Sequence, residues 1–263
     1  MIFLKTDEEI ELMRTADQIV AKTLGEMARM IAPGVTTAQL NKRADEVIRD
    51  HGAEPNFLGY GGFPASICAS VNDVVVHGIP SDDVVLRDGD IISIDCGAVK
   101  DGFHGDSCYT FPVGDVAPDV LELCRTTKQA LLKGIEQALE GHRLGDIGYA
   151  VQNLCEAHGY GVVREMVGHG IGRAMHEEPE VPNYGRRGNG TKLAAGMCIA
   201  IEPMITLGKR DIFFERDGWT CRTVDHKPAA HYEHSVAIRP KGQPADILSG
   251  FQYVREALGD RFI

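Results

Sequence analysis

The sequence lacks the features that mark membrane-spanning, secreted and nucleic-acid-binding proteins. No segment reaches the roughly 20 apolar residues that span a bilayer, and the N-terminal stretch MIFLKTDEEIELM has too short an apolar run for a signal peptide. Lysine and arginine total 27 against 38 aspartate and glutamate, which gives a formal net charge of -11. This balance argues against a basic surface for nucleic acid or anionic lipid. We therefore expect a cytoplasmic protein that binds neither nucleic acid nor a membrane directly.

The sequence also lacks a disulfide framework and a phosphate-binding loop. The seven cysteines form no Cys-x-x-Cys pair, and their odd number is awkward for a set of disulfides. We expect free thiols. The segment GRRGNGTK, residues 185–192, resembles a phosphate loop, but Thr191 precedes Lys192 and no apolar strand leads into it. A nucleotide site of that type is therefore excluded.

What the chain does contain is an internal duplication. Residues 34–53 resemble residues 141–160 at a shift of 107 positions, and both segments end in His-Gly. Apolar spacing predicts a helix in each, and further helices are expected at 6–31 and 117–140. The two terminal histidines, His51 and His158, are typical of helix ends before a glycine cap, so we do not count them as ligands. Because 43% of the 263 residues are hydrophobic, we predict one large domain, 1–263, with repeat halves of about 1–110 and 111–263.

The same shift aligns two carboxylates. It places LRDGDIISIDCG, 86–97, on LAAGMCIAIEPM, 193–204, and so Asp95 on Glu202, each at the end of an apolar, strand-like run. The turn KDG then predicts a hairpin whose returning strand carries Asp106 on the same face as Asp95. In the second half, after a longer excursion at about 207–228, the strand HYEHSVAI supplies Glu233 in the role of Asp106.

Four converging acids require counter-charge, because like charges within a few ångströms oppose folding in a low-dielectric site. The flanking segments SIDCGA, GDSCYTF, AIEPMI and HYEHSVAI contain no lysine or arginine. Two divalent cations would supply all of the missing charge, with Asp106 and Glu233 bridging them. A pair of such ions would also activate a water molecule for hydrolysis.

The segment GHGIGRAMHEEP, residues 168–179, offers two histidines to this cluster. Taken alone it indicates a surface turn with incidental histidines, since it lacks the His-Glu-x-x-His spacing and its glycines disfavour a helix. Beside four acids, one neutral imidazole would complete a two-metal site, and the residues alone do not say which histidine supplies it. Such a carboxylate-rich set suits Mn(II), Fe(II) or Co(II) at least as well as Zn(II).

Taken together, the motifs resemble the type I methionine aminopeptidases over essentially the whole chain. The matching stretches are SVNDVVVHGIP, IDCGAVKDGFHGDSCYTF, GHGIGRAMHEEP, AIEPM, DGWT and YEHS. The resemblance implies an α+β pita-bread fold, in which duplicated halves with pseudo-twofold symmetry form a curved antiparallel sheet covered by helices. It implies five metal ligands for two divalent ions (Co, Mn, Fe or Zn): Asp95, Asp106, His169, Glu202 and Glu233. It also implies catalytic histidines at positions 77 and 176, and we expect Glu202 to move a proton as well as bind metal.

The resemblance further implies a pocket for a methionine side chain and a role in protein maturation. The pocket residues are His77, His176, Tyr60, Phe63, Cys68, Met175 and Trp219. Met175 and Gly61 depart from the usual residues of this pocket, where a phenylalanine and a larger polar residue are common. The expected substrates are N-termini of nascent polypeptides with a small second residue, met by a monomer in transient contact with the ribosome.

Three other interpretations compete with this one, the first of them within the same class of enzyme. A prolidase or proline-specific aminopeptidase would share the five ligands but usually carries a further N-terminal domain, and only about 60 residues precede the pocket here. A binding module of the same fold would lack ligands, whereas all five are present. Redox iron sites use two histidines and one carboxylate, which matches four acids poorly.

Overall fold

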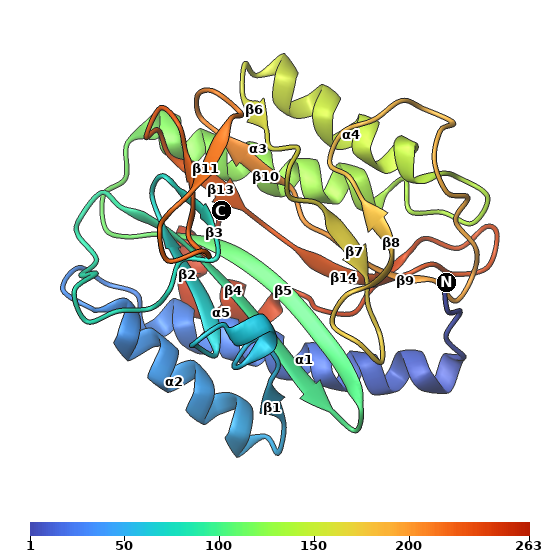
Figure 1. Cartoon of the computed structure of the whole chain (residues 1–263), viewed down its shortest axis with the longest axis horizontal. Coiled ribbons are helices and arrows are strands. Elements are labelled where there is room, and N and C mark those ends of the chain that lie inside the picture. The colour runs from blue at the N-terminus through green and yellow to red at the C-terminus, as the bar shows by residue number, and fades with distance from the viewer.

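The computed structural model describes residues 1–263 and places two helix pairs on opposite sides of the strands (Figure 1). Helices α1 (Asp7–Met30) and α2 (Thr37–Asp50) cover one side, and α3 (Pro118–Ile135) and α4 (Leu144–Ala157) cover the other. All four predicted helices are confirmed, although α3 ends five residues before the expected limit of 140. A short fifth helix, α5 (Gln252–Leu258), was not predicted.

The helix ends follow from their sequences. Thr6 and Thr36 accept hydrogen bonds from the backbone N–H groups three residues later, and the Glu9 and Gln39 side chains bond back, which makes two capping boxes. At the other ends, Nδ1 of His51 donates to the carbonyl oxygen of residue 47 at 2.8 Å, and Nδ1 of His158 to that of residue 154 at 2.9 Å. The interpretation of both histidines as helix-terminal residues is therefore confirmed.

Most of the strands are short, and they pair only antiparallel, which confirms the expected α+β class. They are β1 (Glu54–Pro55), β2 (Ile67–Val71), β3 (Val74–Val76), β4 (Ile91–Lys100), β5 (Phe103–Pro112), β6 (Gly161–Val162), β7 (Gly168–Gly170), β8 (Glu177–Val181), β9 (Cys198–Ile201), β10 (Met204–Thr206), β11 (Ile212–Phe214), β12 (Cys221–Thr223), β13 (Ala229–His231), β14 (His234–Ala237) and β15 (Asp246–Ile247). They form four sheets: β4 with β1 and β2 along one edge and β5 along the other, β13-β10-β6, β11-β12-β3, and β15-β14-β9-β7-β8.

The core lies between these sheets and the helices. A single cluster of 45 buried hydrophobic residues joins the inner faces of the helices to the central strands. Close packing of α1 on β5 depends on Gly105, because a Cβ atom there would lie 2.5 Å from the backbone nitrogen of Asp17. The two longest strands, β4 and β5, are thereby held in place against α1.

The cysteines and the helices agree with the expectations from composition. All seven cysteines are buried and free, so the prediction of free thiols is confirmed. None of the helices combines the length and the apolar character that crossing a membrane requires. The division into halves at about residue 110, which falls inside β5, stays a prediction.

Candidate active site

The first pair of acids lies on the hairpin of β4 and β5. The ladder runs without a break from the pair Ile91 and Pro112 to the turn, with Asp95 opposite Cys108 and Asp106 opposite Gly97. Asp95 and Asp106 are therefore diagonal neighbours on one face, as predicted. One detail of the prediction is wrong: Asp95 is not at the end of its strand but is the fifth of ten residues in β4, because the ladder with β5 continues to Lys100.

The second pair of acids lies where a ladder is interrupted. Ile201 of β9 pairs with His234 of β14, and Met204 of β10 pairs with His231 of β13. Both pairs belong to one register, so Glu202 lies opposite Glu233 in the gap between the two sheets. The expected continuous strand HYEHSVAI is therefore split after His231. The break lies opposite Pro203, which separates β9 from β10 and whose nitrogen cannot donate a hydrogen bond.

The two ladders meet along β5, and this contact brings Asp106 beside Glu233. The backbone N–H of Glu233 donates to the carbonyl oxygen of Cys108 at 2.9 Å, and the Ser107 hydroxyl donates to the Glu233 carbonyl at 2.7 Å. The Ser235 hydroxyl donates to the Asp106 carbonyl at 2.9 Å. Donor atoms of Asp106, Glu233 and His169 lie within 4.8 Å of one another as a result.

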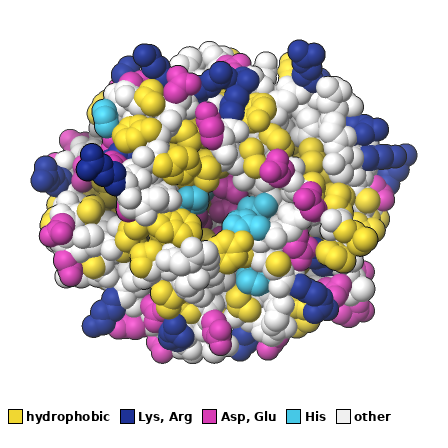
Figure 2. All heavy atoms as spheres, in the orientation of Figure 1, with side chains coloured by type: hydrophobic (Ala, Val, Ile, Leu, Met, Phe, Trp, Pro, Cys, Tyr) yellow, Lys and Arg dark blue, Asp and Glu magenta, His cyan; other side chains and the backbone are white.

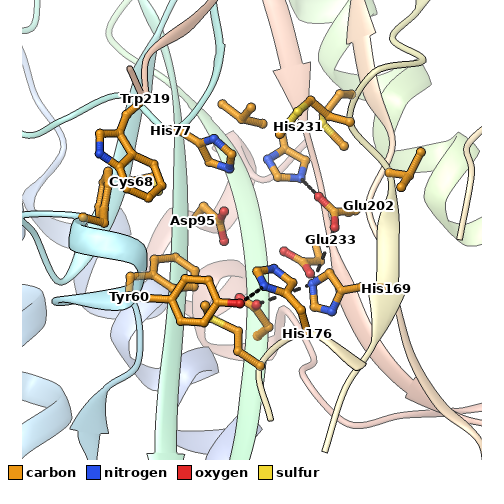
Figure 3. A pocket seen from close by; sticks show the side chains of 18 residues that line it. Tyr60, Cys68, His77, Asp95, His169, His176, Glu202, Trp219, His231 and Glu233 are labelled. Carbon is orange, nitrogen blue, oxygen red and sulfur yellow. Dashed lines mark hydrogen bonds and ion pairs between the residues drawn. The ribbon is translucent and has the colours of Figure 1, made fainter. Parts of the chain in front are cut away.

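His169 reaches this cluster from β7, which lies between β9 and β8. Its Nδ1 donates to the Gly170 carbonyl at 2.9 Å, which leaves Nε2 directed at the acids, 3.7 Å from Glu202 Oε1 and 3.9 Å from Asp106 Oδ2 (Figure 3). Glycine at 168 is required here, because a Cβ atom would lie 2.3 Å from the Ala200 carbonyl oxygen. The surface turn that the segment suggests when taken alone is limited to residues 171–176, because Gly168 and Gly170 are buried in β7 and Glu177 begins β8.

The cluster is buried, and burial changes the charge that each member can carry. It raises the pKa of Asp95 to about 7 and that of Glu202 to about 8, and it raises the pKa values of Asp106 and Glu233 well above the ordinary range, with the neighbouring acids adding to the effect. Burial, with the nearby His176, lowers the pKa of His169 to about 3. The acids thus hold protons unless a cation replaces them, and the imidazole is neutral, as a metal ligand must be.

The hydrogen bonds that the four acids lack are consistent with a site for divalent metal ions. Three buried carboxylate oxygens, Asp95 Oδ1, Asp106 Oδ1 and Glu233 Oε1, have no hydrogen-bond partner, and no lysine or arginine pairs with any of the four acids. Buried polar atoms without partners are costly to a fold and call for an ion or a water. Oxygen ligands joined by imidazole suit Mn(II), Fe(II), Co(II) and Zn(II).

The remaining predicted residues surround a pocket of about 210 Å³ above the acids. Figure 2 shows this hollow, with acidic side chains at its floor, histidines at its edge and apolar side chains around it. Every residue predicted for the site lines it, namely Tyr60, Phe63, Cys68, His77, Asp95, Asp106, His169, Met175, His176, Glu202, Trp219 and Glu233. The structure therefore brings all twelve together.

Two histidines border the pocket without lying among the acids. His77 has a φ of 58°, a left-handed conformation that is uncommon outside glycine, and its ring centroid is 6.2 Å from that of Trp219. His176 lies at the exposed mouth, where its Nδ1 is hydrogen-bonded to the Tyr60 hydroxyl at 2.7 Å. When that hydroxyl donates, Nε2 of His176 carries the proton and can donate to a substrate oxygen.

The apolar part of the pocket is a separate small cluster. It is formed by five buried residues, Phe57, Phe63, Ala65, Cys68 and Met175. Ile79 and Trp219 pack against this cluster. Met175 thus takes its expected place in the pocket. Gly61 adopts a φ of 55° beside Trp219, and a Cβ atom there would come within 3.3 Å of the indole. A glycine at this position leaves room next to the tryptophan ring.

The sequence interpretation missed two buried polar residues at this centre. His231 is 1% exposed and its Nε2 lies 3.3 Å from Glu202 Oε2. Its signal was its position two residues before Glu233, on the same face of an extended segment. Asp17 is fully buried, and its Oδ1 accepts the backbone N–H of Asp106 at 3.1 Å. Its signal was an acid on the apolar face of α1, between Met13 and Val20.

Comparison with known proteins identifies the class to which this fold and site belong. The sequence matches metallopeptidase family M24 over residues 11–240, and the chain belongs to that family. It is 51% identical to a methionine aminopeptidase of Clostridium acetobutylicum over 242 residues, which cover 92% of this chain and 97% of the relative. The resemblance to the methionine aminopeptidases and the expectation of a metallo-aminopeptidase are therefore confirmed.

Solved structures agree with this assignment. A crystal structure of methionine aminopeptidase from Rickettsia prowazekii superposes with a TM-score of 0.93 at 42% identity, over 95% of this chain and 100% of that chain. The prolidase from Pyrococcus furiosus shares the fold with a TM-score of 0.75 at 24% identity, over 94% of this chain but 65% of the prolidase. The predicted pita-bread architecture is thus confirmed.

Proposed function

We propose that the chain removes the N-terminal methionine from nascent polypeptides, with two divalent metal ions and a preference for a small second residue. The observation that carries this proposal is the position of the acid cluster at the floor of an apolar pocket, with three carboxylate oxygens that lack partners. The similarity to proteins named methionine aminopeptidases supports the choice of substrate. The first residue of the substrate would occupy the pocket, and its scissile bond would lie over the acids.

Asp95, Asp106, His169, Glu202 and Glu233 would hold the ions. When bound, the ions would lower the pKa of a water molecule and polarise the scissile carbonyl. Glu202 lies between His169 and His231, and once the ions have displaced its proton its carboxylate would be free to accept a proton from the attacking water and deliver it to the leaving amine.

The histidines at positions 77 and 176 would act on the substrate itself. Burial lowers the pKa of His77 to about 4 and also lowers the pKa of His176, so both rings are neutral near pH 7 and can donate one hydrogen bond each. His176 Nε2, with Nδ1 held by Tyr60, would donate to the scissile carbonyl oxygen as negative charge develops there.

Specificity for methionine would come from the cluster around Phe63, Cys68 and Met175, closed on one side by Trp219. An unbranched thioether adapts to such an apolar cavity and makes favourable contacts with aromatic rings. The catalytic groups at the pocket's floor would leave little space beside the scissile bond, which favours alanine, glycine or serine as the second residue.

One experiment tests the function directly. Metal-free protein is titrated with Mn(II), Fe(II), Co(II) or Zn(II) under anaerobic conditions and assayed on Met-Ala, Leu-Ala and Met-Lys peptides. We expect activity to rise until two ions are bound per chain and to be greatest on Met-Ala. Full activity at one ion per chain would contradict the two-metal mechanism. Equal rates on the three peptides would contradict the proposed specificity.

A further inference from the structure

His231 is a buried imidazole that the five-ligand set does not use. Its side chain is 1% exposed and lines the pocket, and its Nε2 is buried without a hydrogen-bond partner. Figure 3 shows its ring directed at Glu202, on the side away from His169. The separation between His231 Nε2 and Glu202 Oε2 is 3.3 Å. A buried nitrogen that has no partner and faces these acids is a candidate for a further metal-binding atom of the cluster.

The register of the two ladders gives His231 a counterpart. In the first ladder Asp95 lies opposite Cys108, and Asp106 is two residues before that cysteine. In the second ladder Glu202 lies opposite Glu233, and His231 is two residues before that glutamate. By ladder position, therefore, His231 and not Glu233 corresponds to Asp106. Asp106 is the diagonal neighbour of Asp95, and His231 is the diagonal neighbour of Glu202, in each case on the same face.

The distances agree with ligands of a common ion. Donor atoms of Glu202, His231 and Glu233 lie within 4.8 Å of one another. Nitrogen and oxygen ligands sit about 2.0–2.2 Å from such ions, so two of them at a right angle are separated by about 3 Å. The separation of 3.3 Å from Nε2 to Oε2 is close to that value.

The backbone of His231 is held firmly, which fixes the direction of the ring. Its N–H donates to the Thr110 hydroxyl at 3.0 Å, and the same hydroxyl donates to the His231 carbonyl at 2.8 Å. Thr110 belongs to β5, the strand that carries Asp106. The residue is thus fastened to the first ladder while its side chain lies beside an acid of the second.

We propose that His231 is a sixth metal ligand, whose Nε2 binds the ion shared by Glu202 and Glu233. The centre would then contain two imidazoles, from His169 and His231, in place of one. This inference rests on the two-metal function proposed above. Because imidazole favours Co(II), Fe(II) and Zn(II) over the harder Mn(II), a second one would shift the metal preference in that direction.

Counting the imidazoles bound to cobalt tests the proposal. The protein is loaded with two equivalents of Co(II), and proton NMR records the solvent-exchangeable, paramagnetically shifted N–H signals of bound histidine rings. We expect two such signals, one lost in His169→Gln and the other in His231→Gln. A single signal in the unsubstituted protein, lost in His169→Gln, would overturn the proposal, and this count does not depend on the folding of the His231 variant.

The glutamine variant also separates a ligand from a hydrogen-bonding residue. The amide of glutamine can donate a hydrogen bond to Glu202, but it is a much poorer metal ligand than imidazole. We expect His231→Gln to weaken Co(II) binding by calorimetry at least as much as the ~10-fold that loss of an outer partner costs, and to weaken Mn(II) binding less. His158→Gln, at the exposed end of α4, serves as the matched control. Unchanged Co(II) affinity in His231→Gln would contradict the assignment.

These readouts do not depend on peptide hydrolysis. Two imidazole signals in a protein that fails to cleave Met-Ala would support His231 as a ligand and contradict only the proposed function. One signal in a protein that cleaves Met-Ala with two ions bound would contradict only the role of His231. The two proposals therefore fail separately.

Discussion

The two ladders that carry the acids differ in regularity, although the sequence aligns them. The β4–β5 hairpin is unbroken over ten pairs and presents Asp95 and Asp106 as diagonal neighbours. The second ladder is interrupted beside Pro203, where Glu202 and Glu233 face each other between two sheets. The same alignment thus supports two geometries: an unbroken hairpin on one side of the centre and an interrupted ladder on the other. His231 nevertheless takes the position in the interrupted ladder that Asp106 takes in the hairpin, because the register is kept across the break.

Removing the metal ions has the largest expected effect, because it affects both ladders at once. Exhaustive dialysis against a strong chelator is expected to abolish hydrolysis of Met-Ala peptides. Far-ultraviolet circular dichroism is expected to stay near native, because protons neutralise the four acids once the metal ions are removed. Activity is expected to return on adding Co(II) or Mn(II). Hydrolysis that persists after metal analysis shows none remaining would rule out a metal-dependent reaction.

Substituting one acid in each ladder sharpens the comparison. Glu202→Gln is expected to lower kcat by about 10²- to 10⁴-fold even at saturating metal, because it removes a proton acceptor as well as a ligand. Asp95→Asn, in the regular hairpin, is expected mainly to weaken metal binding, so added metal restores more of its kcat. Metal titrations followed by kcat measurements at saturation distinguish the two. Equal recovery in both variants would show that Glu202 has no role beyond binding.

A smaller effect is expected from the histidine at the mouth. His176→Ala is expected to keep two ions per chain and to lose on the order of 100- to 1000-fold in kcat, typical for one oxyanion donor. His169→Ala, the matched variant among the acids, is expected to lose one ion or bind it more weakly. Metal analysis and steady-state kinetics on both variants check this division. Normal metal affinity in both would show that neither histidine is a ligand.

The smallest expected effect is a dependence of stability on pH in the metal-free protein. Burial raises the pKa of Asp95 from 3.8 to about 7 and that of Glu202 from 4.5 to about 8. Between about pH 4 and about pH 8 the folded state therefore holds protons that the unfolded state has released, so the free energy of unfolding falls as pH rises. Urea unfolding at pH 5 and pH 8 measures this difference, and the metal-free double variant Asp95→Asn, Glu202→Gln is the control. The prediction is contradicted if the free energy of unfolding falls no more between pH 5 and pH 8 in the unsubstituted protein than in this control.

Much of the fold followed from local patterns. Apolar spacing and the internal repeat predicted four helices, and the alternation of side chains in the hairpin placed Asp95 and Asp106 on one face. The break after His231 did not follow, because a run such as HYEHSVAI has the same alternation whether or not its ladder is interrupted. The short helix α5 was missed because its seven residues are too few to establish a helical period.

The sequence by itself determined much of the chemistry of this protein: four acids with no basic neighbours and a glycine-rich histidine segment, both encoded in local composition and spacing. The apolar pocket was expected only from the resemblance to a known family. Only the tertiary structure decided which groups share a volume. The contact of β5 with the segment around Glu233 places Asp106 beside that glutamate, and the close approach of β7 to β9 directs His169 at the acids. The same contacts bury His231 and Asp17 at the centre. These pairings join residues far apart in the chain, so they depend on the packing of sheets and helices, which no short stretch of sequence specifies.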